Sequence, residues 1–114
     1  MNVKKDILTK LEAVLPKNSI LATNTSYLDV NKMAAVLRHP ERFLGLHFFN
    51  PAHIMKLLEV IRTDTTSEAT LGAAFRLTKK LRKIPVLSGV CEGFIGNRIL
   101  KRYREAAESM LLQG

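Results

Sequence analysis

Short apolar segments alternate with helical patterns along this chain, and this alternation limits what it can fold into. Apolar segments of strand length occupy residues 19–22, 43–49, 57–61 and 84–87. Apolar residues recur at helical spacing over residues 3–15, 30–37, 71–81 and 95–110. Strands that alternate with helices predict an α/β layer architecture, in which helices pack on a sheet.

Local signals predict where the helices begin and end. Pro16 ends the first helical pattern, and Asp29 or Asn31 is expected to cap the second. Thr65 and Glu68 have capping-box spacing, which predicts the start of the third helix there.

Two of the strands carry signals of their position in the sheet. The segment 19–22 is expected to be a buried parallel strand, because polar residues follow it abruptly. The segment 84–87 is expected at a sheet edge, because Pro85 has no backbone N–H to donate to a neighbouring strand.

The composition predicts one soluble globular unit. The chain has 114 residues, and 46% of them are apolar, which suits a single hydrophobic core. No apolar run approaches the roughly 20 residues that a membrane-spanning helix needs. The single cysteine, Cys91, cannot form an intramolecular disulfide and excludes a metal site built from several cysteines.

The net charge of +8 favours an anionic partner, such as a phosphorylated cofactor, an acidic protein surface or nucleic acid. Basic residues on solvated helix faces are the alternative, and the charge alone does not decide between them. Nucleic-acid binding is the least favoured of these, because basic and aromatic residues are not interleaved and the chain has no recognisable nucleic-acid-binding motif.

His47 lies near the end of the apolar segment 43–49, and Glu59 lies in the apolar segment LLEVI. His47 could be a core histidine with satisfied hydrogen bonds, and Glu59 could face water at a sheet edge. Two adjacent strands joined around Asn50 and Pro51 would instead bring the two side chains together. A buried carboxylate must be paired or hydrogen-bonded. If the carboxylate hydrogen-bonds one imidazole nitrogen, it fixes the tautomer of the ring, and the other nitrogen can then act as a general base.

Ser26 and Asn97 are further candidates. Ser26 follows a predicted strand at the end where open α/β sheets bind ligands, although a serine at this position more often caps a turn. Asn97 either serves as a polar residue near the start of the last helical pattern or donates its amide to a substrate carbonyl. The glycines that precede Asn97 do not have the spacing of a dinucleotide-binding fingerprint.

Three motifs resemble those of the L-3-hydroxyacyl-CoA dehydrogenase family. They are TNTS (residues 23–26), GLHFFNPAHIMKLLEVI (residues 45–61) and GFIGNR (residues 93–98), in this order and spacing. The similarity is strongest to the dehydrogenase part of bifunctional enoyl-CoA hydratase/3-hydroxyacyl-CoA dehydrogenases. It implies an enzyme that oxidises (3S)-3-hydroxyacyl-CoA to 3-ketoacyl-CoA with NAD in fatty-acid β-oxidation.

The resemblance also implies a role for each matching residue. His47 would remove the proton of the 3-hydroxyl group, and Glu59 would orient that histidine and balance its charge. Ser26 would hydrogen-bond the substrate and the cofactor, and Asn97 would hold the substrate's oxygen atoms. The implied cofactor-binding residues are Asn24, Ser26 and Lys4, the last of which would approach the ribose. No metal site is expected.

The matching motifs predict two parts of the family's fold. Residues 1–90 resemble the second half of a Rossmann-type NAD-binding domain, and residues 91–114 resemble the first helix of an all-α C-terminal domain. Because the family's glycine-rich pyrophosphate loop is not among these motifs, the alternative function is a catalytically inactive piece or an assembly module. For the full-length enzyme the resemblance implies a homodimer, without nucleic acid or a membrane span. Its compartment would be the bacterial cytoplasm, or the peroxisome or mitochondrial matrix of a eukaryote.

Overall fold

A computed structural model of the chain describes residues 1–24, 28–90, 99, 102 and 104–108. The elements are α1 (Asn2–Val14), β1 (Leu21–Thr23), α2 (Val30–Ala34), the 3-10 turn η1 (Pro40–Arg42), β2 (Phe43–Phe48), β3 (Leu57–Ile61), α3 (Glu68–Lys80) and β4 (Ile84–Ser88). All four predicted strands are present. The predicted helix over 95–110 lies mainly outside the described residues, although Ile99, Arg102 and residues 104–108 are helical.

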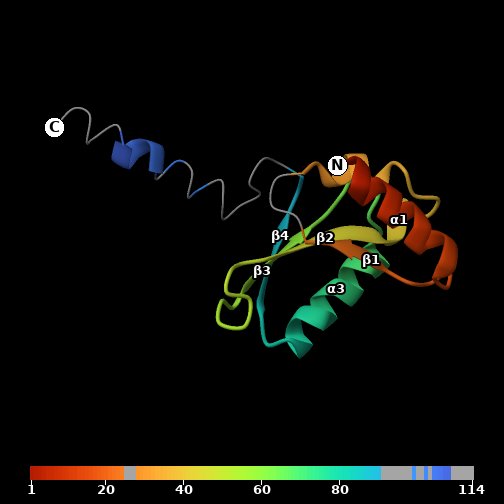
Figure 1. The fold of residues 1–114 in the computed structure, drawn as a ribbon. Helices are drawn as coiled ribbons and strands as arrows, with labels where there is room; N and C mark the ends of the chain where they lie inside the picture. The colour runs from red at the N-terminus through yellow and green to blue at the C-terminus, as the bar shows by residue number, and fades with distance from the viewer. Residues whose placement is uncertain (25–27, 91–98, 100–101, 103, 109–114) are drawn as a thin grey trace.

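The four strands form one mixed sheet in the order β1-β2-β3-β4. β1 runs parallel to β2, β2 runs antiparallel to β3, and β3 runs parallel to β4. Helix α1 lies on one side of the sheet and α3 on the other (Figure 1). The predicted α/β architecture is therefore confirmed, and it matches the layer arrangement of a Rossmann-type domain.

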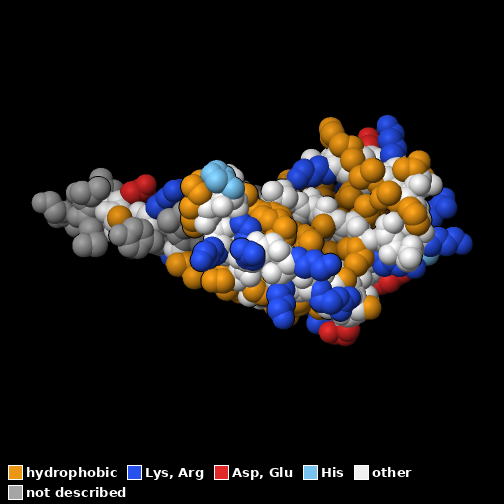
Figure 2. All heavy atoms as spheres, turned by 90° about the horizontal axis from the view of Figure 1, so that it is seen from below, with side chains coloured by type: hydrophobic (Ala, Val, Ile, Leu, Met, Phe, Trp, Pro, Cys, Tyr) orange, Lys and Arg blue, Asp and Glu red, His pale blue; other side chains and the backbone are white. Residues whose placement is uncertain are grey.

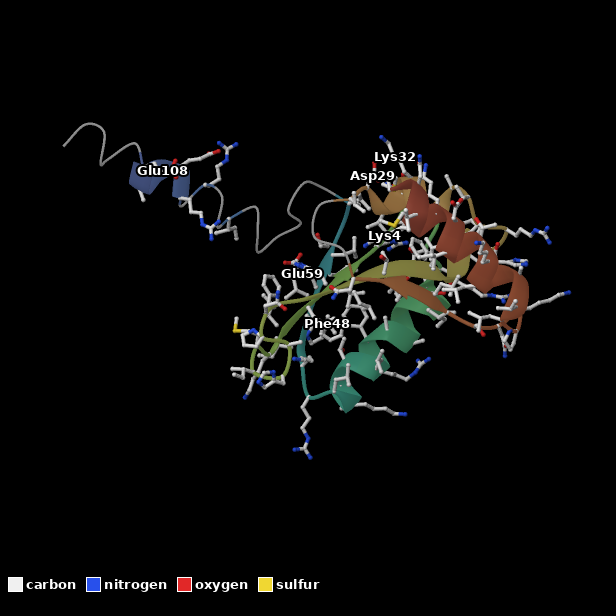
Figure 3. All side chains as sticks on the ribbon, viewed as in Figure 1. Lys4, Asp29, Lys32, Phe48, Glu59 and Glu108 are labelled. Atoms are coloured by element: carbon white, nitrogen blue, oxygen red, sulfur yellow. The ribbon has the colours of Figure 1, made fainter. Side chains whose placement is uncertain are left out.

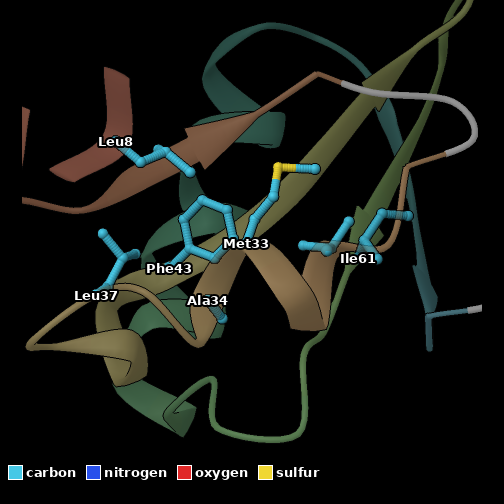
Figure 4. Close-up of a cluster of buried hydrophobic side chains, with 7 residues drawn as sticks. Leu8, Met33, Ala34, Leu37, Phe43 and Ile61 are labelled. Carbon is cyan, nitrogen blue, oxygen red and sulfur yellow. The ribbon is translucent and has the colours of Figure 1, made fainter. Parts of the chain in front are cut away.

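Side chains alternate between the two faces of the sheet, because successive residues of a strand point in opposite directions. Phe43 of β2 and Ile61 of β3 belong to one core cluster, beneath α1 and α2. Figure 4 shows this cluster, which contains Leu8, Val30, Met33, Ala34, Leu37, Phe43 and Ile61. The second cluster lies beneath α3 and contains Leu44, Leu46, Leu58, Val60, Leu71 and Ala74. Odd-numbered residues of β2 and β3 thus point towards α1 and α2.

Gly45 allows β2 and β3 to approach closely on this face. It lies opposite Ile61 in the strand register, and a Cβ added to it would lie 2.8 Å from Cβ of Ile61. Because a Cβ atom is fixed to the backbone and Ile61 is fully buried, neither strand has room to move aside. The glycine therefore keeps the strands that carry His47 and Glu59 in close register.

The two helix-cap predictions had different outcomes. Asp29 caps α2, because its Oδ1 accepts hydrogen bonds from the backbone amides of Asn31 and Lys32. The predicted cap at Thr65 is wrong. Ser67 caps α3 instead, and its Oγ accepts the amide of Thr70 at 3.1 Å. The reason is that hydrogen bonds within the preceding loop use up the threonines, so that the helix starts later.

The two outer strands also differ from each other. β4 lies at one edge of the sheet, as Pro85 predicted. β1 lies at the other edge and runs parallel to β2, as expected. The prediction that β1 is buried is wrong, because its middle residue, Ala22, is exposed. The physical reason is that β1 has a neighbouring strand on one side only in the described part of the chain.

Candidate functional site

His47 and Glu59 lie directly opposite each other on β2 and β3. Opposed residues of antiparallel strands share a face, so both side chains point towards α1 and α2. Their exposed fractions are 4% and 0%, and Nδ1 of His47 lies 3.8 Å from Oε1 of Glu59. This distance is that of an ion pair and is longer than an ordinary N–H···O hydrogen bond. The structure thus brings together the two residues that the sequence predicted to meet.

Burial decides one of the alternatives for Glu59. A carboxylate at a water-facing sheet edge would be exposed, whereas Glu59 is completely buried and lies on an interior strand. Burying a charged carboxylate is costly unless partners stabilise it, and the imidazole of His47 is one such partner. The aromatic ring of Phe49 packs against that of His47, with the two ring centroids 4.7 Å apart.

The end of β1 is attached to the same region. Oδ1 of Asn24 accepts a hydrogen bond from the backbone amide of Phe48, 3.2 Å away. Asn24 follows the last residue of β1, and Phe48 is the last residue of β2, so this bond joins the carboxyl ends of two parallel strands. Open α/β sheets bind ligands beyond such strand ends. The predicted site residues Ser26 and Asn97 lie outside the described residues.

Lys4 lies in the first turn of α1 and is partly buried. The helix precedes β1 and returns along the sheet, so its first turn lies at the end of the sheet where β1 finishes. Figure 3 shows Lys4 and Glu59 on the upper side of the sheet and Phe48 on the lower side. Lys4 therefore belongs to the same face and the same end of the sheet as the His47–Glu59 pair.

Lys83 fixes the loop between β2 and β3. Its Nζ donates to the carbonyl oxygens of Ala52 and of Met55, the latter at 2.6 Å, and lies 5.8 Å from the centre of the Phe48 ring. The amide of Ile84 adds a bond to the carbonyl of Lys56. No sequence signal identifies this contact, because the acceptors are backbone carbonyls that any residue could supply.

The described residues contain no cluster of three or more His, Cys, Asp or Glu side chains that could hold a metal ion. Within the same part of the chain, none of the helices has the length and apolar character needed to cross a membrane. Lys and Arg side chains are spread over the face seen in Figure 2 and do not form a single patch there.

Comparison with known proteins identifies the family. The family described as 3-hydroxyacyl-CoA dehydrogenase, NAD binding domain, matches residues 1–91. The peroxisomal bifunctional enzyme of Cavia porcellus is 44% identical over 114 residues, which are 100% of this chain and 16% of that protein. The fatty acid oxidation complex subunit alpha of Psychrobacter sp. (strain PRwf-1) is 42% identical over 112 residues, 98% of this chain and 16% of that protein.

Solved structures agree with this result. The 3-hydroxybutyryl-CoA dehydrogenase of Escherichia coli K12 superposes with a TM-score of 0.95 at 38% identity, over 98% of this chain and 24% of that one. The chain spans about one sixth of the curated relatives named above, at 16% of their length. The family match, the sequence identities and the superposition together confirm the resemblance: the chain belongs to the 3-hydroxyacyl-CoA dehydrogenase family, in the region of its NAD-binding domain.

Proposed function

We propose that this chain carries the acid–base pair of an enzyme that oxidises (3S)-3-hydroxyacyl-CoA to 3-ketoacyl-CoA with NAD in fatty-acid β-oxidation. The observation that carries the proposal is the buried pair of His47 and Glu59, with Nδ1 and Oε1 3.8 Å apart. The names of the relatives, a peroxisomal bifunctional enzyme and a fatty acid oxidation complex subunit, support the same reaction.

In this proposal His47 is the general base. Its Nδ1 faces Glu59, so Nε2 is the nitrogen that accepts the proton of the substrate's 3-hydroxyl group. As the O–H bond breaks, the C3–H bond gives up its electron pair and C3 becomes a ketone. Bound NAD would supply the acceptor for that hydride. Glu59 stabilises the imidazolium that forms, because its negative charge lies beside the ring in a region shielded from water.

The described residues fit a nicotinamide cofactor at the carboxyl ends of β1 and β2. Asn24 is exposed there, and its Oδ1 is already held by Phe48, so its orientation is fixed and its Nδ2 is a donor. The ammonium group of Lys4 would donate to a ribose hydroxyl from the first turn of α1. On the basis of the family resemblance, we include Ser26 as a residue that contacts both the substrate and the cofactor, and Asn97 as one that contacts the substrate.

The test is reduction of acetoacetyl-CoA with NADH, followed as loss of NADH absorbance. We expect His47→Ala to lower kcat by about a hundredfold or more, the usual contribution of a general base. His53→Ala is the matched control, because His53 is an exposed histidine in the neighbouring loop, and it should leave kcat unchanged. Equal loss in both variants would contradict the role of His47.

A second function, an assembly module without activity of its own, is favoured by one observation. The apolar residues of α1 are largely exposed: Val3 is 71% exposed and Val14 is 78% exposed. A folded chain that binds no NADH and shows no turnover, yet associates with another part of the same enzyme, would support this function instead.

We propose that the longer enzyme is a homodimer and binds no nucleic acid. Its compartment is the cytoplasm if the source is bacterial, and the peroxisome or mitochondrial matrix if it is eukaryotic. The relatives support both settings, since they include peroxisomal enzymes and bacterial subunits.

A further inference from the structure

A cavity lies at the opposite end of the sheet from His47. It has a volume of about 330 Å³ and lies between the end of α1, the start of β1 and the segment from α2 to η1. Leu21, the first residue of β1, and Arg42, the residue before β2, both line it. Because a strand rises about 3.3 Å per residue, Arg42 lies roughly 16 Å along β2 from His47. The cavity is therefore separate from the proposed catalytic site.

The cavity has an apolar wall and a basic rim. The apolar wall includes Leu15, Leu21, Val36 and Leu37. The basic residues that line it are Lys17, Arg38 and Arg42. This volume and this mixture are typical of sites for small molecules that have an apolar body and one charged group.

Arg42 is the least exposed of the three basic residues that line the cavity. Its Nη1 is buried and has no hydrogen-bond partner in the described part of the chain. A guanidinium N–H that is removed from water without an acceptor is unfavourable. Because Nη1 is closed off from water, the other guanidinium N–H groups of Arg42 would be the donors to an oxyanion in the cavity, and a guanidinium can donate two parallel bonds to a carboxylate or a phosphate.

The one carboxylate that lines the cavity is already engaged. Both oxygens of Glu12 accept backbone amides, from Arg38 at 2.7 Å and from His39 at 2.9 Å. His39 lies 3.4 Å from Glu41, so its charge when protonated is also partnered. The cavity is thus lined by three cationic side chains and by one carboxylate, which already accepts two backbone amides. This excess of positive charge favours an anionic ligand.

We propose that this cavity binds a small organic anion with a carboxylate or phosphate group on an apolar body. Arg42 receives the oxyanion, Lys17 and Arg38 add positive charge at the rim, and the leucine and valine side chains contact the apolar body. This inference does not depend on the proposed dehydrogenase reaction.

The test is a titration of the ¹⁵N-labelled 114-residue chain, followed by amide chemical shifts, with hexanoate as the probe. We expect saturable shifts at Arg38, His39 and Arg42 and none at His47. Hexanol, which lacks the charge, and inorganic phosphate, which lacks the apolar body, should each bind more weakly. Absence of saturable shifts with both hexanoate and phosphate would overturn the proposal, and so would equal binding of hexanol and hexanoate.

Variants identify the group that binds the anion. Arg42→Gln should weaken hexanoate binding about tenfold or more, the effect of losing a charged hydrogen bond. Arg76→Gln, which removes the same charge from an exposed position on α3, should leave the affinity unchanged. Equal weakening in both variants would show only attraction to a basic protein, against the proposal. If circular dichroism shows that Arg42→Gln has unfolded, Lys17→Gln on the exposed loop decides: unchanged affinity there overturns the inference.

Discussion

Helices α1 and α3 are both 13 residues long, yet the sheet buries them to very different extents. Four residues of α3 are buried, and its first turn has a side-chain cap and an acidic residue. In α1 only Leu8 is buried, and the helix has no side-chain cap. Both helices are amphipathic, so the difference lies in what covers their apolar faces and not in their sequence pattern. Helix α1 therefore contributes only Leu8 to the core cluster on its side of the sheet, where α2 supplies most of the helical residues, whereas α3 contributes Leu71 and Ala74 to the other cluster.

The largest effect should come from truncating a core residue of α3. Leu71 is 4% exposed and belongs to the core cluster beneath α3, together with Leu44, Leu46, Leu58 and Val60. We expect Leu71→Ala to lower the free energy of unfolding by about 2–4 kcal/mol, through lost burial and a residual cavity. Ile7→Ala on α1, at a residue that is 50% exposed, should cost about 0.5 kcal/mol or less. Urea denaturation measures both, and similar losses would contradict the contrast between the helices.

A smaller effect should follow from removing the cap of α3. Ser67→Ala removes the acceptor of the Thr70 amide, which should destabilise the chain by about 1 kcal/mol. Thr65→Ala is the control, because the sequence pattern placed the cap at that residue. The thermal midpoint of each variant measures the difference, and a larger loss at Thr65 would restore the capping-box interpretation.

The smallest effect concerns Glu12, which ties α1 to the segment between α2 and η1. Burial raises the pKa of its carboxyl group, but hydrogen bonds from the amides of Arg38 and His39, with the charges of those residues, outweigh burial and lower it below 4.5. A carboxyl whose pKa is lower in the folded state stabilises the fold above its unfolded pKa and loses this effect as pH falls through the folded value. Glu12→Gln should therefore be less stable than the parent chain at neutral pH.

Urea midpoints at several pH values measure this dependence. The difference between Glu12→Gln and the parent should be constant above about pH 5 and shrink as the pH falls below 4.5. A difference that grows on acidification would mean that the carboxylate destabilises the fold.

Sequence reasoning located the His47–Glu59 pair because the pair depends on local rules. Two apolar segments joined by a short loop predict neighbouring strands, and side-chain alternation then places both residues on one face. The strand register places the two residues opposite each other, and the close approach of Gly45 to Ile61 in that register is visible only in the structure.

Other features depend on contacts that the sequence does not display. The start of α3 was misplaced because, in the loop before it, the hydroxyl groups of Thr63 and Thr66 bond to each other and that of Thr66 donates to the carbonyl of Phe43. The exposure of β1 depends on which elements lie beside it in space. Lys83 holds the loop between β2 and β3 through backbone carbonyls, which any residue could supply. The cavity beside Arg42 is formed by segments that are distant along the chain.

The antiparallel pairing of β2 and β3 has a consequence for how the pair of His47 and Glu59 assembles during folding. The two residues are separated by only twelve positions, so closing this hairpin costs little chain entropy compared with a contact made across a parallel crossover. We therefore expect His47 and Glu59 to meet through an early, local event, whose cost does not depend on the length of insertions elsewhere in the chain.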